Sequence, residues 1–288
     1  MHYLALVSLI WAFSFGLIGN RLAGLDSFFV AAARLGIAGL LFLPFLRLSV
    51  IPVGAGLRLA ACGAIQFGLM YIGYMKAFLF LPSHLVALFS VLTPLYIVII
   101  HDLRSRRFHP NYLKVALLSI LGAAIIEARS GSGGDIWLGF ALMQVAGLAF
   151  AFGQVYYRDW KQMNPRVPAY QIFAWLYLGG FLATLIASLV FADWGKVTPT
   201  SAQTIVIIYL GIIASGLGFY LWNKGATLCR PGTLAAFNNA VVPLAMACSL
   251  FVFGEISELT LPALVRLLLG SLCIIGAILL AEKTRSES

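Results

Sequence analysis

Two cationic side chains interrupt otherwise apolar stretches of the sequence. Arg34 lies in the run FFVAAARLGIAGLLFLPF, and Lys76 follows Tyr71 and Tyr74 at the end of another apolar run. A charge inside an apolar segment costs about 2.5–3.5 kcal/mol on insertion scales, so such residues are usually functional. The chemistry that they offer is attraction of an anion, such as a carboxylate. A structural alternative stays open for both, in which the side chain snorkels to an interface or bonds to helix-end carbonyls.

Uncharged amides offer a second kind of chemistry, hydrogen bonding that orients a ligand. Asn238 and Asn239 occur together in LAAFNNAVVP, and Gln66 and Asn223 lie within or at the end of other apolar runs. These groups suit a ligand with an amide, a urea or an amino-acid head. The alternative is that they join helices, at about 0.6 kcal/mol per bond. We favour a binding role for the Asn pair, because two adjacent amides cannot both face one neighbouring helix.

Aromatic side chains make up 13% of the chain, and most are typical of membrane-interface belts. Trp11 and Trp175 lie well inside their apolar runs and are candidates for a ligand-facing wall. The complete predicted set of substrate-binding residues is Arg34, Lys76, Asn238, Asn239, Gln66, Trp11, Trp175, Tyr71, Asn223 and Tyr177.

No residue pattern indicates catalysis, a metal or a cofactor. The chain has no GxxxxGK[ST], HExxH or GxSxG motif, and its four cysteines have no CxxC spacing. The histidines His2, His84, His101 and His109 lie near expected loops and are not expected to cluster. We therefore expect no enzyme, no metal site and no cofactor.

The composition places these residues in a membrane. The 288 residues are 61% apolar and 10% charged, with a mean hydropathy of +0.97. Soluble domains average about 45–50% apolar and about 25% charged residues. The net charge of +9 is spread in short clusters between apolar runs, which excludes the continuous basic face of a nucleic-acid-binding protein. The lipid bilayer is the expected surrounding medium.

Ten apolar runs predict ten transmembrane helices, because only helices or closed barrels cross lipid and these runs are too long for barrel strands. The runs are 2–20, 27–46, 57–78, 82–101, 111–127, 136–156, 168–191, 202–222, 231–253 and 262–282. With the N-terminus inside, thirteen Lys and Arg residues fall in cytoplasmic loops or the C-terminal tail and four in outside loops. The positive-inside rule therefore predicts that both termini are cytoplasmic.

An internal repeat divides the chain into residues 1–130 and 131–288. The stretch GAIQFGLMYIGYMKA resembles GIIASGLGFYLWNKG at a constant offset of 148 positions, and after one added residue Pro94 matches Pro243. Both prolines are expected inside spans, where each can kink its helix. Five spans in each half invert the second half, as in many secondary transporters. Residues 131–134 (GSGG) are either the hinge between the halves or a plain exposed turn.

The sequence resembles the EamA type of the drug/metabolite transporter superfamily. The resemblance is clearest in NNAVVPLAMACSLFVFGEISELTLPALVRLLLGSLCIIGAILL, whereas HDLRSRR stands where many relatives have a Gly-Glu-Arg string. Within the superfamily, WAFSFGLIGNRLAGLDSFF, ARLGIAGLLFLPFLR and ASGLGFYLWNKGAT followed by PGTLAAFNN resemble bacterial biotin uptake permeases.

This resemblance implies a multi-pass protein of the bacterial inner membrane that takes up biotin by alternating access, without an ATPase partner. The residues are compatible with biotin, whose carboxylate needs a cation and whose ureido ring needs amide-like partners. The chemistry fits other carboxylate-bearing metabolites equally well. An amino-acid or metabolite exporter or exchanger of the same fold is therefore the alternative function, and a structural subunit of a larger membrane assembly is a second one.

Overall fold

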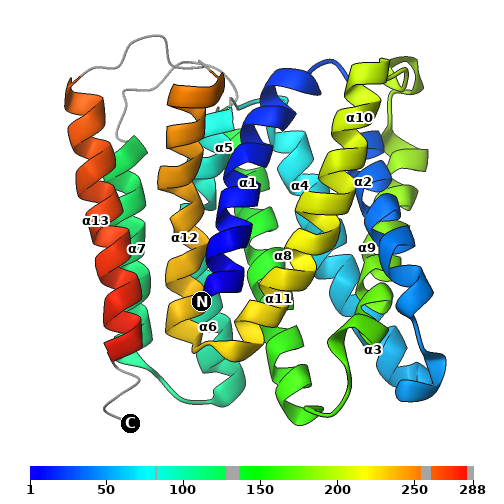
Figure 1. The fold of residues 1–288 in the computed structure, drawn as a ribbon, viewed down its shortest axis with the longest axis horizontal. Coiled ribbons are helices and arrows are strands. Elements are labelled where there is room, and N and C mark those ends of the chain that lie inside the picture. The colour runs from blue at the N-terminus through cyan, green and yellow to red at the C-terminus, as the bar shows by residue number, and fades with distance from the viewer. Residues whose placement is uncertain (82, 128–135, 254–260, 284–288) are drawn as a thin grey trace.

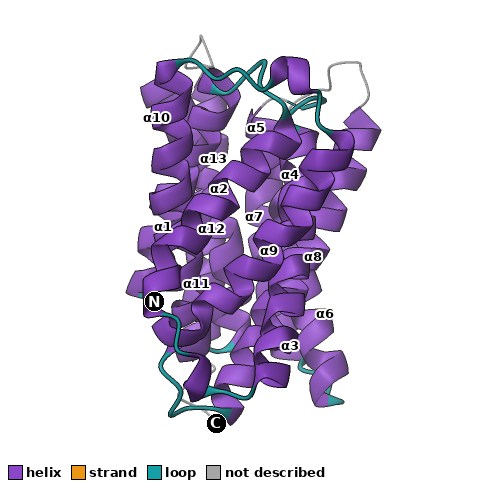
Figure 2. Ribbon diagram, turned by 90° about the vertical axis from the view of Figure 1, so that its right-hand side faces the viewer, coloured by secondary structure: helices purple, strands orange, loops and turns teal. Residues whose placement is uncertain are grey.

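The protein is a bundle of helices that run roughly parallel to one axis (Figures 1 and 2). The computed structural model describes residues 1–81, 83–127, 136–253 and 261–283, and within these ranges it contains no β-strand. The α-helices are α1 His2–Arg21, α2 Ser27–Phe42, α3 Val53–Gly63, α4 Met70–Ala77, α5 Ser83–Phe89, α6 Thr93–Ser105, α7 Pro110–Glu127, α8 Ile136–Met163, α9 Ala169–Phe191, α10 Ser201–Tyr209, α11 Gly218–Leu228, α12 Pro231–Cys248 and α13 Leu261–Lys283. Shorter helical pieces are η1 Leu43–Phe45, η2 Leu48–Val50, η3 Ala64–Leu69, η4 Ser90–Leu92, η5 Trp194–Lys196, η6 Leu210–Leu217 and η7 Ser249–Phe253.

Among the described residues, eight continuous helical stretches are long and apolar enough to cross a membrane. They are His2–Arg21, Ser27–Phe45, Val53–Ala77, Ile136–Met163, Ala169–Phe191, Ser201–Leu228, Pro231–Phe253 and Leu264–Lys283. Their outer faces carry large apolar side chains, such as Leu268, Leu272 and Leu279, each 64% exposed. A surface of this kind needs lipid as its solvent, so the chain is a multi-pass membrane protein.

The fourth and fifth apolar runs take a different form. The fourth is broken into α5 and α6 by the 3₁₀ turn η4, and the fifth is α7, whose apolar part Pro110–Ile125 is shorter than a usual span. Pro94 lies in the first turn of α6, where its missing N–H needs no intrahelical partner. Pro94 therefore lies within the fourth run but at the break in it, whereas Pro243 lies inside the continuous helix α12.

Two long helices contain internal π-helical segments, in which the backbone hydrogen bonds run to the fifth residue, and a third such segment, η7, follows α12. The segment η3 joins α3 to α4, and η6 joins α10 to α11. Glycines in or beside each segment bring it close to another helix: Gly63, the last residue of α3, contacts the backbone of Leu176 in α9, and Gly211 of η6 contacts Ile37 in α2. A Cβ at Gly63 would collide with that backbone, so a side chain there would push the two helices apart.

The helices pack in pairs that recur across the bundle. Extensive contacts join α1 to α12, α6 to α8, α2 to α9 and α7 to α13. In Figure 1, α7 and α13 form one edge, α2, α3 and α9 lie near the other, and α1, α8 and α12 lie between them. The loops after α2, α6, α8 and α11 all lie at the lower end of that view. The GSGG stretch at 131–134 lies outside the described residues.

Candidate functional site

A cavity opens between the middle helices of the bundle, and it has a volume of about 110 Å³. One water needs only about 10–15 Å³ on this measure, so the cavity is more than a packing defect. Its lining comes from seven of the apolar segments, in both halves of the sequence. The lining residues are Trp11, Ser14, Phe15, Arg34, Met70, Tyr71, Tyr74, Ser90, Thr93, Met143, Ala146, Gly147, Phe150, Phe219, Asn238 and Val241.

Arg34 supplies the only positive charge among these lining residues. Its side chain is 3% exposed, its Nε donates to Ser215 Oγ over 3.3 Å, and its Nη1 lies 3.7 Å from Met75 Sδ. The guanidinium carbon lies 4.8 Å from the centre of the Tyr71 ring. No carboxylate in the described part of the chain forms an ion pair with Arg34. A buried charge is normally paired, so the cavity offers an anion a strong site.

Ser215 connects Arg34 to the backbone of η6. Its hydroxyl lies 2.8 Å from Tyr71 Oη, while Tyr177 Oη donates to the carbonyls of Ser215 (2.8 Å) and Gly216 (2.6 Å). Trp11 Nε1 donates to the neighbouring carbonyl of Ala214 over 2.9 Å. A π-helical turn disturbs the regular backbone bonding, and these donors satisfy carbonyls that face the middle of the bundle. Arg34 is therefore held on a prearranged polar surface.

Asn238 supplies the second polar group of the cavity. Its Nδ2 donates to the Leu234 carbonyl (2.8 Å) and to Gln154 Oε1 (3.3 Å), and its Oδ1 lies 3.5 Å from Gln154 Nε2. Gln154 Oε1 also accepts from Trp222 Nε1 over 2.8 Å. This buried network fixes the orientation of the Asn238 amide and uses both of its N–H groups, so the amide can meet a ligand as a hydrogen-bond acceptor through Oδ1.

An aromatic wall lies between the charged and the amide groups. Trp11 packs against Phe150, Phe219 and Trp222 with ring centres 5.7, 5.3 and 4.7 Å apart, and Tyr71 packs against Phe219 at 5.8 Å. These rings favour an apolar or ring-shaped ligand body. The predicted site residues Arg34, Asn238, Trp11 and Tyr71 thus come together at one cavity, although they lie far apart in sequence.

The other six predicted site residues lie outside the lining. Tyr177 does not face the cavity but donates to the carbonyls of Ser215 and Gly216, as described above. Lys76 Nζ lies 5.0 Å from the centre of the Phe28 ring, and Gln66 Nε2 donates to Asn223 Oδ1 over 3.2 Å in a fully buried contact.

Trp175 and Asn239 also face away from the cavity. Trp175 packs on Gly56, and its Nε1 has no partner in the described structure. Asn239 Nδ2 donates to the Val91 carbonyl at the break in the fourth run (3.1 Å) and to Ser119 Oγ (3.2 Å). Asn238 and Asn239 therefore do contact different helices.

The predicted set of binding residues does not include Ser215 or Gln154, nor the rings of Phe150 and Phe219. Ser215 and Gln154 carry a usable signal, because each is a polar residue within an apolar span. The phenylalanines carry none, since apolar residues line every face of such helices. Only the packing of the helices distinguishes a ring that faces the cavity from one that faces lipid.

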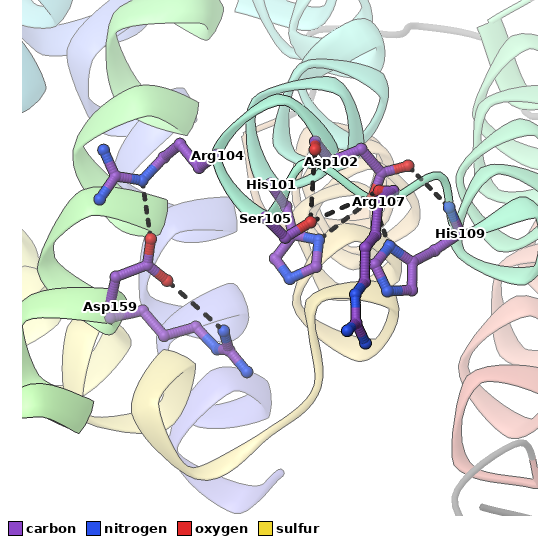
Figure 3. Close-up of polar contacts among 8 residues, drawn as sticks. His101, Asp102, Arg104, Ser105, Arg107, His109 and Asp159 are labelled. Atoms are coloured by element: carbon purple, nitrogen blue, oxygen red, sulfur yellow. Dashed lines mark hydrogen bonds and ion pairs between the residues drawn. The ribbon is translucent and has the colours of Figure 1, made fainter.

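A separate group of polar contacts lies at the lower end of the bundle (Figure 3). Arg104 Nε of α6 lies 2.7 Å from Asp159 Oδ2 of α8. Next to this ion pair, Asp102 Oδ1 lies 3.1 Å from His101 Nδ1 and 2.7 Å from His109 Nδ1. The expectation that the histidines do not cluster was therefore wrong for this pair, because the chain reverses between α6 and α7.

The helical architecture is that of a multi-pass membrane protein with a central cavity, and comparisons with known proteins give its class and family. The EamA-like transporter family matches residues 1–128. The biotin transporter of Escherichia coli K12 is 39% identical over 260 residues, which cover 88% of this chain and 85% of the relative. The chain belongs to the EamA-like transporter family.

Two further known proteins are similar to this chain over nearly its whole length. The probable biotin transporter of Pseudomonas aeruginosa is 38% identical over 290 residues, covering 100% of this chain and 99% of that protein. A solved structure, titled only as the crystal structure of a protein, superposes with a TM-score of 0.74 at 19% identity and covers 99% of this chain and 98% of its own. That structure supports the fold alone.

Proposed function

We propose that this protein imports biotin across the bacterial inner membrane, as a secondary transporter that needs no ATPase partner. The observation that carries the proposal is the buried guanidinium of Arg34, which faces the cavity without a carboxylate partner among the described residues. The two similar proteins named as biotin transporters favour this substrate over other carboxylates.

The chemistry of biotin matches the three parts of the cavity. The carboxylate of its side chain would pair with Arg34, and an N–H group of its ureido ring would donate to Asn238 Oδ1. The apolar bicyclic body between them would pack on Trp11, Phe219 and Tyr71. A small cavity with few polar groups and an aromatic wall is typical of a small-molecule site.

We further propose that the bundle has ten transmembrane helices in two inverted halves, residues 1–130 and 131–288. Two observations support this architecture. The π-helical segments η3 and η6 contain Gly68 and Gly216, which are 148 residues apart in the matching stretches. The contact of α1 with α12 recurs as the contact of α8 with α6, and that of η3 with α9 recurs as that of η6 with α2.

The loop charges support cytoplasmic termini. Arg47, Arg106, Arg107, Arg166 and Arg230 lie in or beside the loops at the lower end of Figure 1, whereas the upper loops carry Asp26 and Asp193. By the positive-inside rule, the lower end faces the cytoplasm.

The conformer described here is, on this proposal, accessible from the outer side. Arg34 and Met143 lie seven residues after the upper starts of α2 and α8, about 10 Å along each helix. Towards the cytoplasm the path is blocked by the buried Gln154–Trp222 contact and by the Arg104–Asp159 ion pair between α6 and α8. Alternating access would require these inner contacts to open while the upper end closes.

Uptake of labelled biotin by proteoliposomes that contain the purified protein tests the proposed function. We expect saturable uptake of labelled biotin. An excess of unlabelled biotin should abolish this uptake, whereas an excess of biotin amide, which lacks the negative charge, should not. Excess amino acids should leave uptake unchanged.

The alternative function has a distinct outcome in the same vesicles. If labelled amino acids exchange and biotin does not, the protein is an amino-acid transporter. If the purified protein transports neither biotin nor amino acids, both transport functions are wrong and the protein is instead a subunit of a larger membrane assembly.

A further inference from the structure

The contacts of Asp102 bring three potential metal ligands to the reversal between α6 and α7. His101 and Asp102 lie in the last turns of α6, and His109 immediately precedes α7. Both imidazole Nδ1 atoms approach the same carboxylate oxygen, and one ligand atom from each residue lies within 4.8 Å of the others. The side chains are 16%, 12% and 32% exposed, so they are sheltered but accessible from the aqueous end.

The three side chains are held in place by contacts around them. The backbone N–H of His109 donates to Asp102 Oδ2 over 2.9 Å, which leaves Oδ1 directed at the two rings. Tyr112 stacks on the His109 ring at 5.0 Å and 14°, and it also lies 5.7 Å from the His101 ring. The left-handed conformation of Arg106, with φ 52°, lets the chain turn back over Asp102. Such support of ligands by surrounding groups is characteristic of metal sites.

The charges near the site allow a cation. Asp102 is its one acid. Figure 3 shows Arg107 beside the two histidines, and the charge of Arg158 also acts on His101. Arg158 lies 3.8 Å from Asp159 and donates to the Cys229 carbonyl over 3.4 Å. Asp159 also pairs with Arg104. Asp159 therefore partly offsets the positive charges of Arg104 and Arg158, and the carboxylate of Asp102 stays available to a cation.

We propose that His101, Asp102 and His109 bind a divalent ion of the late first transition row, with Zn²⁺ as the representative. Nitrogen and carboxylate ligands bind Zn²⁺ at about 2.0–2.2 Å, so ligand atoms around one tetrahedral ion are about 3.3–3.6 Å apart. The observed N···O distances of 2.7 and 3.1 Å would therefore have to lengthen by less than about 1 Å, which side-chain rotation can supply. In the two hydrogen bonds to Asp102 each neutral ring carries its proton on Nδ1, and binding of the ion through Nδ1 would shift that proton to Nε2 by exchange with water. The ion therefore replaces two hydrogen bonds without net release of protons. Imidazole and carboxylate together select Zn²⁺ or Ni²⁺ over Mg²⁺ and Ca²⁺.

The bound ion would fasten the end of α6 to the start of α7, beside the Arg104–Asp159 contact. This inference does not depend on which substrate the cavity accepts. Its readout is therefore metal binding, and a failure of biotin transport leaves it intact.

Calorimetric titration of the full-length, tag-free protein with Zn²⁺, after treatment with a chelator, tests the proposal. We expect saturable binding of one ion per chain and a rise in melting temperature with Zn²⁺ or Ni²⁺, but not with Mg²⁺ or Ca²⁺. His109→Ala and Asp102→Asn should each weaken Zn²⁺ binding at least tenfold, which is within the range for loss of a ligand or its support.

The matched control is His2→Ala, which removes an exposed histidine at the start of α1 and should bind Zn²⁺ like the wild type. His109→Gln provides a second variant of similar size, and its melting temperature without metal shows whether it is folded. The proposal is overturned if the wild type shows no saturable Zn²⁺ binding. It is equally overturned if folded His109→Ala or His109→Gln binds as tightly as the wild type.

Discussion

The π-helical segments η3 and η6 lie in matching stretches of the sequence, but they differ in the side-chain hydrogen bonds that they form. In η6, Trp11 and Tyr177 donate to backbone carbonyls, and Ser215 joins the segment to Arg34 at the cavity. In η3, no side chain of the described structure donates to a carbonyl, and Gln66 instead bonds to Asn223 away from the cavity.

This difference separates two segments that share the same kind of backbone irregularity. The backbone irregularity is common to both segments, but only η6 has become part of the polar surface around Arg34. The segment η3 serves packing, because Gly63 and Gly68 bring it close to α9. Substitutions around η6 should therefore affect substrate binding or the stability of the cavity, whereas those in η3 should not alter affinity.

Loss of the Arg34 charge should have the largest effect. Arg34→Gln removes the cation that we propose pairs with the substrate carboxylate, and truncating one partner of a buried charge pair costs about 2 kcal/mol or more. We expect at least about a 30-fold weaker dissociation constant for biotin, measured by calorimetry on purified protein.

Two variants serve as comparisons for Arg34→Gln. Arg34→Lys keeps the charge and should retain part of the affinity, although lysine cannot form the two-pronged contact of a guanidinium. Arg58→Gln changes an exposed arginine of α3 and should bind biotin normally. Equal affinity in Arg34→Gln and the wild type would show that the carboxylate is bound elsewhere.

The sequence predicted the features that depend on single segments. Long apolar runs allow only helices in lipid, and Arg34 stood out because an isolated charge within such a run is costly. The roles of Asn238 and Asn239 could not be separated, because adjacent residues point about 100° apart on a helix and only the packing shows which neighbour each meets.

The π-helical hydrogen bonding and the chain reversal between α6 and α7 could not be predicted from the apolar runs. Hydropathy is the same for an α-helical and a π-helical turn, so η3 and η6 left no signal in composition. The approach of His109 to Asp102 depends on the left-handed backbone conformation of Arg106, and residues other than glycine rarely adopt this conformation. The exclusion of a histidine cluster failed because sequence spacing does not reveal such a turn.

Removal of the Tyr177 hydroxyl should have an intermediate effect, mainly on stability. Tyr177→Phe leaves the carbonyls of Ser215 and Gly216 without their side-chain donor in a fully buried place. An unsatisfied buried polar group costs about 1–3 kcal/mol. We expect a lower melting temperature in detergent, with less change in biotin affinity than for Arg34→Gln. The exposed Tyr170→Phe is the matched control, and a Tyr177→Phe protein as stable as that control would contradict a supporting role for the hydroxyl.

Replacement of Gln66 in η3 should have the smallest effect on binding. Its Oε1 has no hydrogen-bond partner in the described structure, its side chain is fully buried, and it does not line the cavity. Gln66→Leu removes that unpaired acceptor but leaves Asn223 Oδ1 without its donor, so the two contributions to stability oppose each other. We expect a dissociation constant for biotin within about twofold of the wild type, since a twofold change is below about 0.5 kcal/mol. The measurement should use the same calorimetric titration as for Arg34→Gln, with the melting temperature recorded to confirm folding. A tenfold loss of affinity in a folded Gln66→Leu protein would mean that η3 contributes to the site as η6 does, and the contrast between the two segments would then be wrong.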